Sequence, residues 1–245
     1  MALKILLDRL AKAGRRVKII YTVATCHNPT ASTLSLGRRH AVLALAERHG
    51  ALVVEDYTYG DICFEALPPP LIALDRARTI HLGSFSKTIA PGLRTGWVAA
   101  PRDIVAGLVQ GRTDLGTSPL LQRGIARFFE EGLFEPHLAK ITARYLRKRD
   151  QLVESLEEHC RDFVNWAVPT GGFFIWATLK TGGVQQLLEP AREEGVAFLP
   201  GSYFSANPGA FPANFRLSYG EIPEERLAEG IGRLGRALER GAVRV

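Results

Sequence analysis

The chain is poor in cysteine, which limits how it can be stabilised. Cys26, Cys63 and Cys160 are the only cysteines among 245 residues, and no two of them form a CxxC pair. Folds built on disulfides need several paired cysteines, so we do not expect a disulfide scaffold. The pattern fits a reducing compartment, and we expect a cytoplasmic protein.

Metal-ligand patterns and membrane-spanning runs are also missing. The six histidines stand singly, without the spacing of zinc ligands, so we expect no metal site. No apolar run is long enough to span a bilayer, so no membrane association is expected. Residues 1–16, MALKILLDRLAKAGRR, lack the apolar stretch of a signal peptide and predict a short amphipathic helix.

Basic residues outnumber acidic ones, but the sequence lacks the features of a nucleic-acid platform. The net charge is +6, and the densest basic run contains Arg144, Arg147, Lys148 and Arg149. The surrounding residues 141–159 have helical periodicity, so these charges are expected on a solvated helix face. Aromatic residues do not alternate with the basic ones, as stacking on bases requires. We expect no nucleic-acid partner.

The composition itself is that of a globular α/β protein. Apolar residues make up 46% and charged residues 23% of the chain, which suffices for one large core or two modest ones. A helical pattern at 34–50 separates the first two of several β-branched runs. Strands are predicted at residues 18–23, 51–54, 79–82 and 96–100. Strands that alternate with helices predict a mainly parallel sheet with helices on both faces.

The second half of the chain has a different pattern. Helical periodicity fills residues 101–160, and a last helix is predicted at about 223–240. Shorter strands are predicted at residues 173–179, 196–199 and 215–219. We therefore expect a large domain over 1–140 and a smaller α+β domain over 141–245, joined by a long helix near 141–158.

Polar side chains follow three successive predicted strands at the point where each ends. Asn28 follows the first, and Asp56 ends the second with Tyr59 three residues later. The third is followed by the stretch GSFSKTIAPGLRTGW, which contributes Ser84, Ser86, Lys87 and Arg94. Ligands of open α/β sheets bind beyond the carboxyl ends of the strands, so we expect one shared site.

The chemistry of these groups indicates a ligand. Hydroxyls, loop amides and Arg94 suit an anion, Asp56 suits a protonated nitrogen, and the Lys87 amine can attack a carbonyl. Pyridoxal 5'-phosphate offers a phosphate, a pyridine nitrogen that stays protonated beside a carboxylate, and an aldehyde that reacts with lysine. Its phenolic oxygen can accept hydrogen bonds from Asn28 and Tyr59.

Each of these residues also has an ordinary structural explanation. Alone, Lys87 is a surface lysine, Asp56 a cap or strand-end charge, and Asn28 part of a common turn. The two serines can bond loop backbone and Arg94 can pair with a nearby acid. His81, inside an apolar strand, is expected to be a satisfied core histidine. The combination of groups after successive strands favours the cofactor.

The sequence resembles the fold-type I pyridoxal-phosphate enzymes, specifically the class I/II aminotransferases of the 2-aminoadipate (LysN-like) and kynurenine-type branch. The resemblance extends over essentially the whole chain, and SFSKTIAPGLRTGW is its most specific part. It is carried, in order, by HNPTAS, VVEDYTYGDICFE, GSFSKTIAPGLRTGW, PTGGFFIW, GVAFLPGSYF and NFRLSYG.

The resemblance implies an activity that moves an amino group between an amino acid and a 2-oxo acid. Lys87 would be the catalytic lysine that holds the cofactor aldehyde and shuttles the proton, and Asp56 would pair with the pyridinium. Arg216, in NFRLSYG, would clamp the substrate α-carboxylate. The resemblance also implies a homodimer with sites at the subunit interface.

The remaining predicted contacts to the cofactor follow from the same resemblance. Its phenolic oxygen would be bound by Asn28 and Tyr59. Its phosphate would be held by Ser84, Ser86 and Arg94.

The sequence departs from the family pattern in two places. Family members have a further N-terminal part of the large domain, which supplies a phosphate-binding turn, an aromatic residue on the cofactor ring and part of the dimer interface. Residues 1–20 contain none of these, so we expect the chain to lack that part. Ala31 also stands where the family usually has glycine.

Several functions remain open at this point. Lyases, decarboxylases and racemases of fold type I share the same cofactor grip. A non-catalytic effector-binding domain of a GntR-type regulator, or an inactive remnant, is the alternative of a different class. An α/β protein without a cofactor is the third.

Overall fold

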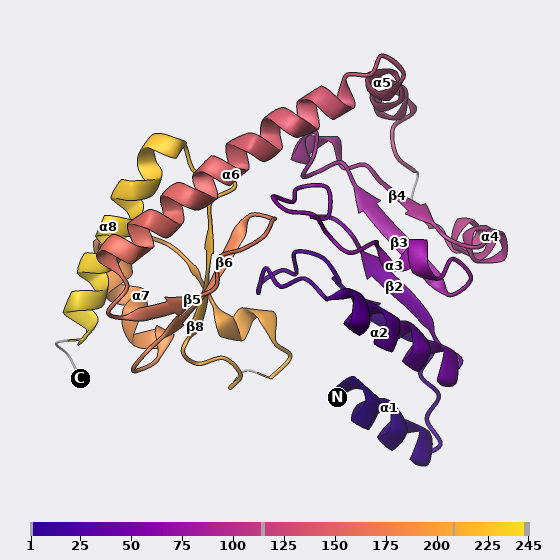
Figure 1. Ribbon diagram of the computed structural model, residues 1–245, viewed down its shortest axis with the longest axis horizontal. Helices are drawn as coiled ribbons and strands as arrows, with labels where there is room; N and C mark the ends of the chain where they lie inside the picture. Colours follow the sequence, from indigo (N-terminus) through magenta and orange to yellow (C-terminus); the bar gives the residue numbers. More distant parts are fainter. Residues whose placement is uncertain (1, 114–115, 208, 243–245) are drawn as a thin grey trace. The chain divides into compact units, whose positions relative to one another are not determined.

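The chain folds into two compact units, each built around its own four-stranded sheet (Figure 1). The computed structural model describes residues 2–113, 116–207 and 209–242. The first unit consists of Met1–Cys26 and Thr33–Ala139, and the second of His27–Ser32 and Lys140–Val245. Asn28 therefore belongs to the second unit, although its segment lies between two strands of the first in the sequence.

The sheet of the first unit is mostly parallel. Its strands, in spatial order, are β1 (Ile19–Thr22), β2 (Leu52–Asp56), β3 (Thr79–Ser84) and β4 (Gly96–Ala99). The first three are parallel to one another, and only β4 runs antiparallel to its neighbour. All four predicted strands of the first half are confirmed, and so is the α/β class. The strands form where the sequence is rich in β-branched residues, which favour the extended backbone.

Helices and a leucine-rich core complete the first unit. The helices are α1 (Ala2–Lys12), α2 (Leu36–Arg48), α3 (Leu71–Leu74), α4 (Arg102–Gln110), α5 (Pro119–Glu130) and the start of α6 (Phe134–His159). Leu7, Leu43 and Leu71 pack with Ile20 and Val53 in one buried cluster, which joins the first three helices to the sheet. The predicted amphipathic helix at the beginning of the chain is confirmed as α1.

The second unit has an antiparallel sheet. Its strands, in spatial order, are β5 (Val164–Trp166), β6 (Phe174–Leu179), β8 (Asn214–Ser218) and β7 (Leu199–Pro200). The helices of this unit are the rest of α6, α7 (Val184–Glu193) and α8 (Glu224–Ala242). Ile175, Phe215 and Leu217 point to one face and form the core with the helices. Successive side chains alternate between faces, so Trp176 and Arg216, which pair directly, point to the other face.

The prediction of a strand at residues 196–199 is wrong for most of its length. The Val196 amide donates to the Ala191 carbonyl at the end of α7 (2.8 Å), so this residue caps the helix. Only Leu199 and Pro200 pair with β8. Three further elements, α3, β5 and α7, were not predicted, and the last of them contains Pro190.

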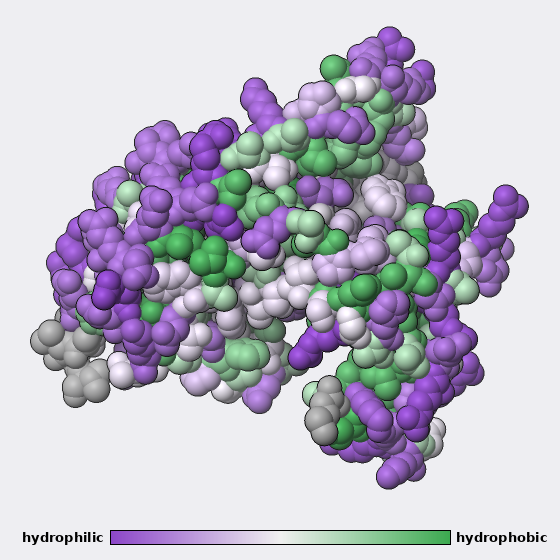
Figure 2. All heavy atoms as spheres, viewed as in Figure 1, coloured by the Kyte–Doolittle hydropathy of each residue, from purple (hydrophilic) through white to green (hydrophobic). Residues whose placement is uncertain are grey.

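The basic run on α6 is only partly a solvated face. The side chains of Arg144 and Arg147 are 60% and 64% exposed and lie near Glu224, at 3.0 and 3.9 Å. Lys148, in contrast, is 3% exposed, and its Nζ donates to the Gly220 carbonyl at 2.8 Å. The prediction is therefore wrong for Lys148, whose stem packs inward, and for Arg149, whose side chain is only 13% exposed. The surface over α8 is largely hydrophilic (Figure 2).

Among the helices of the described ranges, none combines the length and the apolar character needed to cross a bilayer.

Candidate functional site

The carboxyl ends of β2 and β3 lie side by side in the first unit because the two strands are parallel. Asp56, the last residue of β2, pairs in register with Leu82, and Ser84 ends β3 two residues later. The Tyr57 amide donates to the Leu82 carbonyl (2.9 Å), which extends the contact beyond Asp56. The loop after Ser84 therefore begins at the sheet edge where β2 also ends.

The Asp56 carboxylate accepts three hydrogen bonds. Its Oδ2 accepts one from the Tyr21 hydroxyl (2.7 Å), and its Oδ1 accepts two from Thr58, through the amide (3.1 Å) and the hydroxyl (2.6 Å). Burial, followed by the bond to Asp56, raises the pKa of Tyr21 to about 12, so this phenol is a donor at neutral pH. The carboxylate is thus oriented at the strand end before any ligand binds.

Lys87 lies in a turn that the backbone closes tightly. The amides of Ile89 and Ala90 both donate to the Phe85 carbonyl, at 2.9 and 3.1 Å. His137, in the first turns of α6, contacts the Thr88 carbonyl through Nε2 (2.8 Å), so that this nitrogen is the donor. The half-buried lysine therefore projects from a backbone that is held on both sides.

Ser84, Ser86 and Arg94 provide the groups that were predicted to bind an anion. The Ser84 hydroxyl accepts a hydrogen bond from the Ser86 amide (3.2 Å), so this serine does bond loop backbone. The Arg94 guanidinium contacts the Ser86 hydroxyl and the Pro91 carbonyl only at 3.5 Å. In the part of the chain that the structure describes, Arg94 forms no ion pair with an acid, so its exposed charge remains available to an anion.

Buried charges lie on the opposite side of β2. Strand alternation turns Glu55 away from the Asp56 side, and its carboxylate is 0% exposed. One oxygen accepts from the Leu71 amide and the other contacts His81 Nδ1, both at 2.8 Å. Arg39, also 0% exposed, lies 3.5 Å from Glu55. The prediction that His81 is a satisfied core histidine is confirmed.

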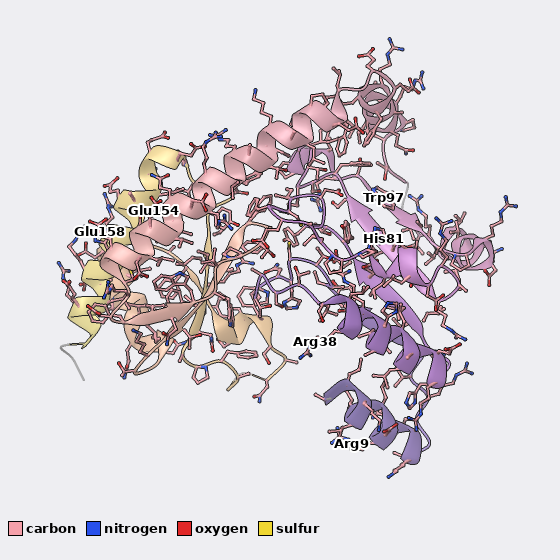
Figure 3. All side chains as sticks on the ribbon, viewed as in Figure 1. Arg9, Arg38, His81, Trp97, Glu154 and Glu158 are labelled. Carbon is pink, nitrogen blue, oxygen red and sulfur yellow. The ribbon has the colours of Figure 1, made fainter. Side chains whose placement is uncertain are left out.

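Two aromatic rings lie close to the ring of His81 on β3. The His81 ring lies 4.9 Å from the Tyr57 ring and 5.2 Å from the Trp97 ring, and Figure 3 shows His81 beside Trp97. Gly83 allows this arrangement, because a Cβ there would lie 2.1 Å from the Trp97 ring. The glycine directly before Ser84 is therefore required by close packing.

The second unit holds the other two predicted residues. Arg216 on β8 donates from Nη1 to Oδ1 of Asn28 (2.7 Å). Its guanidinium carbon lies 4.0 Å from the centroid of the Phe174 ring and 4.9 Å from that of Phe204. Stacking on aromatic faces favours a delocalised cation and keeps its plane fixed. The arrangement presents one oriented guanidinium on the sheet face away from the core.

The predicted site residues thus form two groups, one in each unit. The first unit holds Asp56, Tyr59, Ser84, Ser86, Lys87 and Arg94, and the second holds Asn28 with Arg216. Within the ranges described, no cluster of histidine, cysteine, aspartate or glutamate could hold a metal ion.

Two residues that orient Asp56 were missed by the sequence analysis. The bond from Thr58 has a sequence signal, since an aspartate often accepts from the amide two residues later in a turn. Tyr21 has none, because its contact depends on the pairing register of β1 and β2.

Comparisons with known proteins show the family of the chain. A family model described as aminotransferase class I and II matches residues 1–234. The chain is 38% identical over 238 residues to aromatic-amino-acid aminotransferase 1 of Thermococcus litoralis, covering 95% of this chain and 57% of that protein. It is 35% identical over 219 residues to an HTH-type transcriptional regulator, YisV, of Bacillus subtilis, covering 87% and 45%.

One solved structure is similar to almost the whole of this chain. LysN, the alpha-aminoadipate aminotransferase of Thermus thermophilus complexed with N-(5'-phosphopyridoxyl)-L-leucine, matches with a TM-score of 0.89 and 35% identity. The match covers 98% of this chain and 64% of that one. The chain spans about half the length of the curated relatives that it matches.

Proposed function

The chain belongs to the aminotransferase class I and II family, and on this premise we propose that it binds pyridoxal 5'-phosphate and transfers amino groups between amino acids and 2-oxo acids. The observation that carries the proposal is the pair of adjacent strand ends with the oriented Asp56 carboxylate and the Lys87 turn. The phosphopyridoxyl ligand of LysN supports the choice of cofactor.

The donor set of the first unit suits this cofactor. Asp56 would hold the protonated pyridine nitrogen, and Lys87 would provide the amine that holds the aldehyde. Arg94, which lacks an acidic partner among the described residues, would neutralise the phosphate together with the hydroxyls of Ser84 and Ser86. Tyr59 would donate to the phenolic oxygen. When bound, the cofactor supplies an electron sink for the negative charge that develops at the substrate α-carbon.

Three side chains would then act on the substrate and the cofactor. Lys87 Nζ would take the proton from the α-carbon of the amino acid and later return a proton, as a general base and acid. Arg216 would pair with the α-carboxylate through its planar guanidinium, and Asn28, which already orients that guanidinium, would bind the phenolic oxygen.

A second function is favoured by the match to YisV. Such a chain could bind the cofactor and an amino acid without turnover and act as an effector-binding domain. Transamination of a 2-oxo acid distinguishes the two proposals, because only the enzyme releases a new amino acid. The resemblance to fold-type I enzymes further leads us to propose a cytoplasmic protein that forms a homodimer. Light scattering of the purified chain would test the dimer.

An absorbance titration with pyridoxal 5'-phosphate tests cofactor binding. We expect a visible band that borohydride removes as it fixes the cofactor covalently to the protein. Lys87→Ala should abolish the band. Lys12→Ala, an exposed lysine on α1, is the matched control and should keep the band. A wild-type spectrum that equals the sum of protein and free cofactor would contradict the proposal. A band without turnover of 2-oxoglutarate and amino acids would favour the effector-binding domain.

Replacement of the guanidinium by an ammonium tests the substrate site. Arg216→Lys keeps the charge but loses the planar donor set, so KM for amino acid and 2-oxo acid should rise roughly tenfold to hundredfold, the equivalent of one charged hydrogen bond. The exposed Arg226→Lys should leave KM unchanged. An equal KM in both variants would remove Arg216 from the substrate site.

A further inference from the structure

Two of the three cysteines lie next to each other in the first unit. The Sγ atoms of Cys26 and Cys63 are 3.4 Å apart, although 37 positions separate the residues in the sequence. Both are free thiols; Cys26 is 1% exposed and Cys63 is half-buried. Cys160 is also free but lies in the core of the second unit.

The surroundings of the pair make Cys26 the more acidic of the two thiols. A hydrogen bond from Cys63, assisted by Thr33 and the Arg39 charge, lowers the pKa of Cys26 against the opposing effect of burial. The same hydrogen bond, together with burial, raises the pKa of Cys63. Arg39 is anchored close by, since it donates to the Thr25 hydroxyl at 2.7 Å. The thiolate is the reactive form of cysteine, so Cys26 is the nucleophile of the pair.

We propose that Cys26 and Cys63 form a reversible disulfide when the chain meets a hydroperoxide. The two sulfurs, 3.4 Å apart, have to approach by about a further 1.4 Å to reach the disulfide length of about 2.05 Å. Half-exposed Cys63 marks the side from which a small oxidant can enter.

The chemistry balances with hydrogen peroxide as the only oxidant. The Cys26 thiolate attacks one peroxide oxygen, the O–O bond breaks, and sulfenic acid and hydroxide form. The Cys63 sulfur then attacks the Cys26 sulfur, and its proton converts the hydroxide to the first water. The S–O bond breaks, and the leaving oxygen takes up the proton that Cys26 released on ionisation, which gives the second water. Two thiols lose two electrons in total, and one peroxide is reduced to two waters. A dithiol reductant reverses the oxidation.

The disulfide would act on the cofactor site, a consequence that rests on the proposed function. Cys26 directly precedes the segment His27–Ser32, which carries Asn28, and Cys63 lies four residues after Tyr59. Asn28 and Tyr59 are the two residues that we assign to the phenolic oxygen of the cofactor. Cys26 already has a left-handed backbone with a φ of 49°. A covalent link at that point would restrain both segments, so oxidation should weaken cofactor binding.

Mass spectrometry of the full chain tests the disulfide directly. The chain is treated with hydrogen peroxide, quenched with catalase, unfolded and alkylated with iodoacetamide. We expect one alkylated cysteine, a peptide that links positions 26 and 63, and three alkylated cysteines after dithiothreitol. Cys160→Ala should still form the link, whereas Cys26→Ser and Cys63→Ser should not. Three alkylated cysteines in the oxidised wild type, or links that involve Cys160, would overturn the proposal.

Cofactor titration of the oxidised chain tests the consequence separately. We expect the Kd for pyridoxal 5'-phosphate to rise severalfold in the oxidised wild type and to recover after reduction, with no change in Cys63→Ser. A mapped disulfide with an unchanged Kd would refute the coupling to the cofactor site. If the reduced chain binds no cofactor at all, the proposed function fails, while the peptide map still decides whether the disulfide forms.

Discussion

The hydroxyl of Tyr21 on β1 donates a 2.7 Å hydrogen bond to Oδ2 of Asp56, the last residue of β2. Tyr21 pairs in register with Val54, two positions before Asp56, so both side chains leave the sheet on the same face. The bond therefore crosses from one parallel strand to the next and completes the set that Thr58 begins. It makes the position of the proposed pyridinium partner depend on the pairing of two strands.

Removal of this hydroxyl should weaken cofactor binding without unfolding the chain. Tyr21→Phe leaves Asp56 with both bonds from Thr58, so we expect a loss of about 1 kcal/mol, or roughly a fivefold higher Kd for pyridoxal 5'-phosphate. Absorbance titration measures this value. Tyr203→Phe, 74% exposed in the second unit, is the control and should leave Kd unchanged.

The contact between Tyr21 and Asp56 also contributes to a raised pKa of the Tyr21 phenol. An ordinary tyrosine with a pKa near 10 is largely ionised at about pH 10.5, whereas Tyr21, with a pKa of about 12, should remain neutral. The phenolate absorbance at this pH should therefore be equal in wild type and Tyr21→Phe, with circular dichroism to verify the fold. A lower phenolate signal in the variant would show that Tyr21 titrates normally.

Loss of the Glu55 charge should be strongly destabilising. Glu55→Gln keeps the shape of the side chain but leaves the fully buried Arg39 without its counter-charge. Breaking a buried ion pair in this way costs about 3–5 kcal/mol, which urea unfolding at neutral pH can measure. Glu47→Gln removes a 70% exposed partner of Arg78 and should cost less than about 1 kcal/mol. Similar losses in the two variants would contradict the role of the buried network.

A methyl group on Gly83 should disturb the stacked rings beside the site. The Cβ of Gly83→Ala would lie 2.1 Å from Trp97, so the indole has to move away from His81. Overpacking of this kind costs about 1–3 kcal/mol. Gly92→Ala, whose Cβ would meet nothing within 4 Å, is the matched control. Tryptophan fluorescence and thermal unfolding should change in the first variant only.

Lys148 should make stability depend on alkaline pH. Burial is the main cause that lowers the pKa of this ammonium, so the unfolded chain binds the proton more tightly than the folded chain does. Stability from this group therefore rises as the pH increases from the lowered value to the ordinary value near 10.5. Lys148→Met keeps the buried stem and removes the titration. The stability difference between wild type and variant should shift in favour of the wild type as the pH rises through this window; a constant difference would refute the argument.

Local sequence was sufficient where a structure depends on neighbours in the chain. The runs around Val53 and Ile80 became β2 and β3, because β-branched residues favour extended backbone whatever they pack against. The failure at residues 196–199 is also local in origin. The Val196 amide is used by the end of α7, a competition that apolar periodicity does not reveal.

Contacts between residues that are far apart in the chain could not be predicted from the sequence. Tyr21 and Asp56 meet only because β1 and β2 pair in one register, and a shift by one residue would place them on opposite faces. Cys26 and Cys63 are in contact because the segments that follow β1 and β2 lie next to each other. Neither contact leaves a signal in composition, spacing or periodicity.

The sequence by itself determined the α/β class, the four strands of the first unit and the candidate residues that follow three of them. These features follow from backbone preferences and from the direction of parallel strands, which act residue by residue. Only the tertiary structure decided that Asn28 groups with Arg216, that Glu55 and Lys148 are buried and that two thiols face each other. Those outcomes depend on strand register and on the packing of side chains that are far apart in the sequence, where small differences in free energy select one arrangement.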